Sequence, residues 1–186
     1  MIEVRIVEVA ALDAAQTERC AVILLAALRH MPSAWPDLRS ARAEVARFRS
    51  GGDGLARAAL DAGGEVLGWI GCLAHQPPSA ELHPLVVDPR RQRQGIGTRL
   101  VRVLEAELRR LGIVSLWLGT DDDFGGTNLF GRDLYPEPLR HLQGLAATAK
   151  GHPFVFYRRL GYTVTGVLPD ANGPGRHDIL MAKRLT

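Results

Sequence analysis

The feature that most constrains the fold is a glycine-rich turn that joins an apolar strand pattern to an amphipathic helix pattern. The turn has the sequence Gln92-Arg93-Gln94-Gly95-Ile96-Gly97-Thr98. Residues 80–87 before it alternate as a strand does, and residues 98–111 after it place their leucines on one helical stripe. Gly95 and Gly97 let the main chain turn tightly, although any strand-to-helix turn could use two glycines. The N–H groups and the dipole of the following helix would favour an anion here.

Positive charge gathers around this turn. The chain of 186 residues has 23 Lys and Arg against 20 Asp and Glu, a net charge of +3. Residues 80–112 alone hold seven basic and four acidic side chains, so the excess lies where a phosphate would dock. The small total argues against a dedicated nucleic-acid binder. The turn lacks the Gly-Lys-Ser/Thr ending of P-loop enzymes and the third glycine of the dinucleotide fingerprint, which excludes both of those nucleotide-binding classes.

The composition predicts one globular domain over residues 1–186. Apolar residues make up 46% and charged residues 23%, and the length suits a single domain. Cys20 and Cys72 are too few for a disulfide framework and lack metal-ligand spacing, which predicts a reduced, cytoplasmic location and no metal. No apolar run approaches the ~20 residues of a membrane span, so no membrane partner is expected.

Hydrophobic periodicity predicts an alternation of strands and helices. Strands are expected at residues 1–8, 55–60, 66–73, 80–87, 114–118, 162–167 and 179–183. Helices are expected at residues 14–28, 40–48, 98–111, 139–149 and 152–160. The order is that of an α+β protein with one βα unit at its centre.

The strand expected over residues 80–87 carries candidate chemistry. Alternation places Glu81, His83, Leu85 and Val87 on one face. Pro84 interrupts the strand, and because proline cannot donate a ladder hydrogen bond it predicts an edge, a bulge or a local splay. Glu81 could hold an ammonium group and accept its proton through water, and His83 could relay that proton. A solvated Glu81 and a structural His83 are the alternatives.

Further motifs make the sequence resemble one enzyme superfamily. They are Glu81-Leu82-His83-Pro84-Leu85-Val86-Val87, Leu118-Gly119-Thr120-Asp121-Asp122, Asp133-Leu134-Tyr135, His152-Pro153-Phe154-Val155-Phe156-Tyr157, Gly161-Tyr162, Gly166-Val167-Leu168-Pro169-Asp170-Ala171-Asn172-Gly173 and Asp178-Ile179-Leu180-Met181-Ala182-Lys183. With the Gln-x-x-Gly-x-Gly turn, they resemble the GNAT acetyltransferases, in particular the aminoglycoside 6'-N-acetyltransferases. The match is dense from about residue 66 to residue 184 and thin before that. It implies an α+β GNAT-type acyl-CoA N-acyltransferase fold, a central mixed β-sheet flanked by helices.

The resemblance implies acetyl-CoA as the co-substrate and no metal. The pyrophosphate would lie on the turn, and the pantetheine arm would pair with the main chain of the preceding strand, where a bulge at Pro84 makes room. The residues that would bind acetyl-CoA are Val86, Val87, Gln92, Arg93, Gln94, Gly95, Ile96, Gly97 and Thr98.

Four residues form the predicted catalytic set: Glu81, His83, Leu85 and Tyr157. The resemblance assigns Glu81 as base or substrate anchor. The Leu85 N–H would stabilise the acetyl oxygen, while core packing is the alternative for its side chain. The Tyr157 phenol would protonate or stabilise the departing thiolate. A buried tyrosine with a structural hydrogen bond is the alternative.

Carboxylates on a later segment suit a cationic acceptor. Asp121, Asp122 and Asp123 follow a predicted strand end, and adjacent carboxylates favour a cationic partner, although a solvated turn would look the same. Aminoglycosides carry several ammonium groups. The predicted acceptor-binding residues are Glu81, Asp121, Asp122 and Trp35, the last stacking on a sugar ring.

The resemblance predicts acetylation of an aminoglycoside 6'-amino group by direct attack in a ternary complex, within a homodimer. The acceptor could instead be another polyamine, a protein or a small-metabolite amine. A module that binds CoA or drug without turnover is the remaining alternative.

Overall fold

The computed structural model describes residues 3–31, 34–50, 54–74 and 78–186. These residues form two compact units. The first is built from the described residues up to Leu116, without Met31, together with Leu185–Thr186. The second is built from Met31 and Trp117–Arg184.

The first unit contains four antiparallel strands in the order β1-β2-β3-β4. They are β1 (Arg5–Glu8), β2 (Gly54–Leu60), β3 (Val66–Ala74) and β4 (Ser79–Val87). The turn between β2 and β3 is held by Asp61, whose Oδ1 accepts the N–H groups of Gly63 and Glu65, both at 2.9 Å. The strands predicted over residues 55–60 and 66–73 are therefore confirmed, and they form an antiparallel hairpin.

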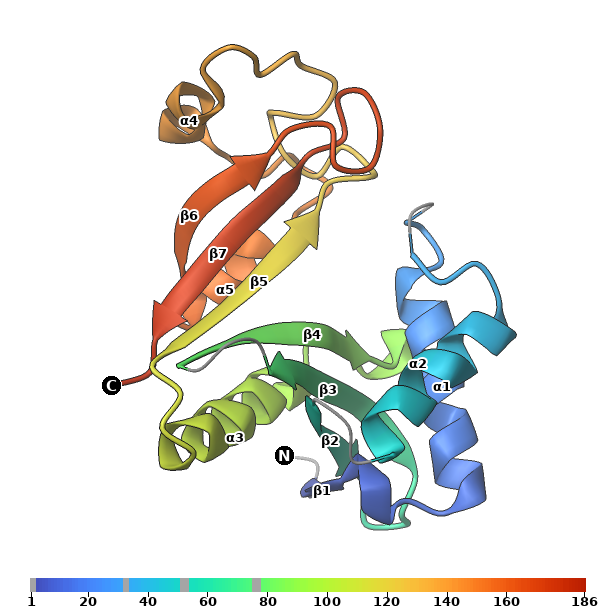
Figure 1. Cartoon of the computed structure of the whole chain (residues 1–186). Coiled ribbons are helices and arrows are strands. Elements are labelled where there is room, and N and C mark those ends of the chain that lie inside the picture. Colours follow the sequence, from blue (N-terminus) through green and yellow to red (C-terminus); the bar gives the residue numbers. More distant parts are fainter. Residues whose placement is uncertain (1–2, 32–33, 51–53, 75–77) are drawn as a thin grey trace. The chain divides into compact units, whose positions relative to one another are not determined.

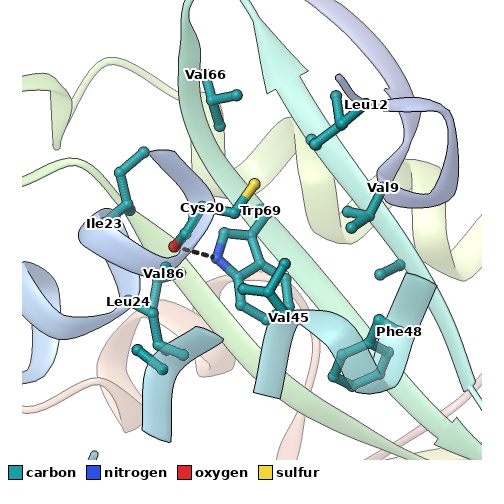
Figure 2. Packing of buried hydrophobic residues seen from close by; sticks show 14 of the residues in the cluster. Val9, Leu12, Cys20, Ile23, Leu24, Val45, Phe48, Val66, Trp69 and Val86 are labelled. Carbon is teal, nitrogen blue, oxygen red and sulfur yellow. Dashed lines mark hydrogen bonds between the residues drawn. The ribbon is translucent and has the colours of Figure 1, made fainter. Parts of the chain in front are cut away.

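Helices α1 (Ala14–Leu28) and α2 (Leu38–Arg49) cover one face of this sheet (Figure 1). Each begins with a capping box, formed by Asp13 and Gln16 in α1 and by Asp37 and Ser40 in α2. Figure 2 shows the core beneath them, in which the Trp69 indole N–H donates to the carbonyl of Cys20 at 3.1 Å. The Phe48 ring packs edge-on against Trp69 at a centroid distance of 5.7 Å.

Helix α3 (Ile96–Arg110) packs on the opposite face. Arg57 of β2 lies opposite Ile70 in the register, on the face away from Trp69, and its guanidinium contacts Glu107 of α3. The apolar stripe predicted for this helix is buried at Leu100, Val101, Leu104 and Leu108, whereas Leu111, which follows the last residue of the helix, is exposed. Two short 3-10 helices, Val9–Ala11 and Pro89–Arg91, complete the unit.

Strand β5 (Ser115–Asp121) begins in the first unit and belongs to the second from Trp117 on. The second unit also contains β6 (Thr163–Leu168) and β7 (Asp178–Arg184), and the strand order is β5-β7-β6. Helix α5 (Phe154–Arg159) lies where a helix was predicted. Helix α4 (Pro138–His141) and the 3-10 helix Leu142–Gly144 are short. None of the helices in the described residues is long and apolar enough to cross a membrane.

The helix predicted over residues 139–149 is wrong beyond its first residues. The Asn128 side chain donates to Gly144 O at 2.8 Å and accepts from Ala146 N at 2.9 Å. Thr127 also forms a β-bridge with Ala147. These hydrogen bonds to Thr127 and Asn128 take the place of hydrogen bonds within a helix. Residues 145–147 are therefore extended despite their helix-like apolar spacing. Strand β5 also extends past its predicted end, to Asp121.

Candidate active site

A bulge in β4 is the central feature of the candidate site. Ile70 pairs with Leu85 and Cys72 with Leu82, so Gly71 alone lies opposite both His83 and Pro84. One extra residue on β4 defines a β-bulge. The bulge predicted from Pro84 is therefore confirmed.

The bulge reverses the alternation of the strand. Glu81 pairs with Leu73 and Val86 with Trp69, which places both on the face covered by α1 and α2. Leu85 pairs with Ile70, on the face covered by α3, and Val87 follows it there opposite Gly68. The prediction that Leu85 and Val87 share a face with Glu81 is therefore wrong, because a single inserted residue shifts a two-residue period.

Gly71 is the residue that permits the bulge. A Cβ on Gly71 would lie 2.4 Å from the carbonyl oxygen of His83 and 2.7 Å from Cζ of Phe48. The main chain of β4 thus approaches β3 closely at this position, next to the Phe48 ring of α2. A glycine inside a strand pattern is a signal that the sequence does contain. That Gly71 lies opposite Pro84, however, follows only from the register of β3 with β4.

His83 lies in a small polar cluster with two residues from outside β4. Its Nε2 is 3.6 Å from Glu44 Oε1 of α2, and its ring centroid is 5.6 Å from that of Trp35. The Glu44 side chain is 14% exposed, against 35% for His83. Contact with His83 holds the pKa of Glu44 below its usual value against the opposing effect of burial, and the Trp35 side chain is a further hydrogen-bond donor.

Glu44 was missed by the sequence analysis. It lies between Ala41, Val45 and Phe48, which are all buried. An acid on the apolar stripe of an amphipathic helix is the signal that could have found it.

The turn after β4 leads into α3 without a side-chain cap among the described residues. Gly95 is the N-cap residue with φ +83°, a left-handed conformation that glycine adopts without strain. No side chain of the described residues caps α3, and its first turn has no acid. The N–H groups of residues 96–98 therefore lack an internal acceptor. This geometry suits a phosphate.

Asp88 fixes the turn before it reaches α3. Its Oδ1 accepts the Arg90 N–H at 2.9 Å, and its Oδ2 contacts the guanidinium groups of Arg90 and of Arg19 from α1. The Gln92 amide donates to the Val87 carbonyl at 3.3 Å, so this predicted CoA contact also orients the loop. A groove of about 400 Å³ continues along α3, where Arg99, Arg102 and Arg110 line it.

In the second unit, the three adjacent aspartates occupy different environments. Asp122 is fully buried, and its carboxylate accepts hydrogen bonds from Gly126 N at 2.6 Å, Thr127 N at 2.8 Å and Thr127 Oγ1 at 2.6 Å. We therefore assign Asp122 to loop stabilisation rather than to an acceptor. Asp121 is half-buried and accepts from the Asn172 amide at 2.6 Å. The buried Asp123 side chain faces Arg176 at 3.9 Å.

Tyr157 is buried on α5 among aromatic rings. The Tyr162 ring lies edge-on at 5.6 Å and the Phe156 ring at 5.1 Å. Burial raises the pKa of the phenol far above its usual value, so the hydroxyl stays protonated at neutral pH. Complete proton transfer to a thiolate, whose thiol has a pKa of about 8.5, would be uphill. Stabilising a thiolate by a hydrogen bond is the role that this environment favours.

His152 fixes the start of α5. Its Nδ1 accepts the N–H of Phe154 at 3.2 Å, and its Nε2 lies 3.2 Å from the carbonyl of Asp121. Burial lowers the pKa of His152, and Asp122 and Asp121 oppose that effect only in part. The ring is therefore neutral, with its proton on Nε2.

Comparison with known proteins decides the family. The model of the acetyltransferase (GNAT) family matches residues 13–132. The chain belongs to the GNAT family of acetyltransferases. A GNAT enzyme transfers the acetyl group of acetyl-CoA to an amine, and this is the reaction of the protein. A comparison with the curated proteins gave no match.

Solved GNAT structures share the fold over nearly the whole chain. An aminoglycoside 6'-N-acetyltransferase complexed with coenzyme A is 35% identical with a TM-score of 0.86, covering 98% of this chain and 97% of the other. The aminoglycoside 6'-N-acetyltransferase from Enterococcus faecium is 36% identical with a TM-score of 0.84 and the same coverage. An aminoglycoside 6'-acetyltransferase type Ii is 31% identical with a TM-score of 0.71, again covering 98% and 97%. The fold class predicted from the sequence is confirmed.

The residues expected to take part in the GNAT reaction are divided between the two units. The first unit holds Glu81, His83, Trp35 and the unpredicted Glu44 on the face covered by α2. It also holds Leu85 on the opposite face and the start of α3 at Gly95. The second unit holds Tyr157, Asp121 and Asp122. Each predicted site residue thus lies in a described element or loop.

Proposed function

We propose that the protein acetylates the 6'-amino group of aminoglycosides. The observation that carries this proposal is the 35% and 36% identity, over 98% of the chain, to two solved aminoglycoside 6'-N-acetyltransferases. The same coverage supports the proposal that both compact units belong to one acetyltransferase domain. The thiol-release experiment below tests the acceptor.

Acetyl-CoA would be held by the turn and by the end of β4. We infer that its pyrophosphate accepts N–H groups at the start of α3, supported by Gly95 and by the absence of a side-chain cap in the described residues. The main chain at Val86 and Val87 would pair with the pantetheine amides. Arg93, with φ +60°, stands exposed on the same turn and adds positive charge.

The transfer would proceed by direct attack. The amine nitrogen bonds to the thioester carbonyl carbon, the carbon–sulfur bond breaks, and the amine proton leaves through water toward Glu81 or His83. The Leu85 N–H would stabilise the negative charge that develops on the acetyl oxygen. Tyr157 would hydrogen-bond the departing thiolate.

The two cysteines support the absence of an acyl-enzyme. Burial raises the pKa of the Cys20 thiol to about 12 and that of the Cys72 thiol to about 12. At neutral pH these thiols are almost entirely protonated, and the thiolate is the reactive nucleophile. Cys20 is also fully buried, next to the Trp69 indole in the core (Figure 2).

A thiol-release assay tests the proposed acceptor. The protein is given acetyl-CoA with kanamycin, with polyamines or with basic peptides, and free CoA is measured over time. We expect the highest kcat/KM with kanamycin. Turnover only with polyamines or peptides would reject the aminoglycoside acceptor and retain the acetyltransferase. Binding of acetyl-CoA with no acetylated product in any mixture would indicate a binding module.

A further inference from the structure

The carboxylate of Glu44 on α2 faces one imidazole nitrogen of His83, the residue two positions after Glu81 on β4. Glu44 Oε1 lies 3.6 Å from His83 Nε2, an ion-pair distance. The Glu44 side chain is 14% exposed, so the carboxylate has little water to solvate it. Such a charge remains ionised only where neighbouring groups stabilise it. His83 faces the carboxylate at ion-pair distance, the Trp35 side chain is a hydrogen-bonding neighbour, and Arg47 adds a favourable charge.

The contact selects one form of the imidazole. A carboxylate next to Nε2 stabilises a proton on that nitrogen, so the lone pair of the neutral ring lies on Nδ1. The His83 side chain is 35% exposed, so it can reach a bound molecule or water. A carboxylate that orients a histidine and stabilises its cation is the arrangement that makes histidine an effective general base.

We propose that Glu44 is a positioning residue that holds His83 in its Nε2–H form, so that Nδ1 of His83 accepts the proton from the attacking amine or from a bridging water. When the amine nitrogen bonds to the acetyl carbon, its proton passes to Nδ1 and the imidazolium faces the Glu44 carboxylate. Glu81 then serves as the anchor for the ammonium group of the acceptor. This role for His83 rests on the proposed amine acetylation.

The groups around His83 come from three parts of the chain. Glu44 lies on α2, and Glu81 lies two residues before His83 on β4 itself. Trp35, which lies in the segment before α2, is uncharged. Arg47 contacts Glu44 from the exposed side at 3.9 Å. Glu44 and Glu81 are acidic, and Arg47 is directed at Glu44.

Nitrogen-15 NMR of the unliganded protein tests the positioning directly. Spectra at alkaline pH distinguish the two neutral tautomers of His83. We expect the Nε2–H form alone in the wild type and a mixture with the Nδ1–H form in Glu44→Leu, which removes the acceptor. Predominant Nδ1–H in the wild type, or an unchanged tautomer in Glu44→Leu, would overturn the proposal. This result does not depend on the identity of the acceptor.

Steady-state kinetics with kanamycin tests the consequence. We expect Glu44→Leu to lower kcat by about tenfold or more, with KM for acetyl-CoA changed less than about twofold, and Glu44→Asp to recover part of the loss. The matched control is Glu18→Leu, an exposed glutamate paired with Arg42 at 2.6 Å, which should retain wild-type kcat. A wild-type kcat in Glu44→Leu contradicts the proposal. If no aminoglycoside is acetylated by the wild type, the proposed function fails while the NMR result still decides the pair.

Discussion

Replacing Gly71 with alanine tests whether the β4 bulge depends on a missing side chain. The new Cβ would lie 2.4 Å from the His83 carbonyl oxygen and 2.7 Å from Phe48 Cζ, whereas real Cβ contacts essentially never fall below 3.0 Å. The main chain at His83 would therefore move by at least 0.6 Å, the difference between the first distance and that limit. The first neighbour is a main-chain atom, and the Phe48 ring that carries the second is buried in the core.

The expected loss follows from two opposing terms. Overpacking of this kind costs about 3 kcal/mol at its upper end, and the smaller conformational entropy of alanine in the unfolded chain offsets up to about 1 kcal/mol. A net loss of about 2 kcal/mol in the free energy of unfolding lowers Tm by about 4–8 °C for a chain of this size. Thermal unfolding followed by circular dichroism measures it.

Gly166→Ala is the matched control, because Gly166 also lies in a strand beside a register shift. A Cβ there would meet Leu180 Cδ1 at 3.5 Å and Cβ at 3.8 Å, ordinary contacts, so Tm should stay within about 2 °C of wild type or rise. If Gly71→Ala matched this control, the close approach at the bulge would be refuted as the reason for the glycine.

Three further predictions concern the second unit. Tyr157→Phe should lower kcat by about 100-fold with little change in KM for acetyl-CoA, because only the hydroxyl that stabilises the thiolate is lost; an unchanged kcat would remove this role. Asp122→Asn should lower the free energy of unfolding by about 2–3 kcal/mol in urea titrations, because the amide NH₂ would replace one of the two accepting oxygens and face the N–H of Gly126 or of Thr127; unaltered stability would show that these bonds matter little. Because the pKa of buried His152 is lowered, the unfolded chain binds a proton more readily, so stability should fall as pH drops through about 6.5. Thermal melts of His152→Gln should show a smaller fall over that range, while a slope equal to wild type would contradict the assignment.

Most helices and strands could be predicted because capping residues and apolar spacing, which are both local in sequence, determine where they form. The helix over residues 14–28 was predicted with both ends correct, since Asp13 caps its start and the apolar spacing is regular. The turn before α3 was predicted from Gly95 and Gly97, which stand between a strand pattern and a helix pattern. In contrast, the segment after Gly144 is extended because Asn128 and Thr127 bind it, and no local signal reports such distant partners.

The sequence predicted which residues lie in the candidate site better than it predicted how they are arranged. Pro84 indicated the bulge, but the bulge moves Leu85 and Val87 to the face opposite Glu81, which follows only from the register with β3. Glu44 was missed because its neighbour His83 is 39 residues away in the sequence. Asp122 was predicted as a ligand because three adjacent aspartates look alike in sequence, whereas burial and three hydrogen bonds distinguish it from Asp121.

The most direct test of the central claim compares two aminoglycosides that differ only in an amine or a hydroxyl at carbon 6'. Each is incubated with the purified protein and acetyl-CoA, and the product is identified by mass spectrometry and NMR. We predict one added acetyl group on the 6'-nitrogen of the first compound and no acetylated product from the second. Equal acetylation of both, or an acetyl group at another nitrogen, would contradict the claim.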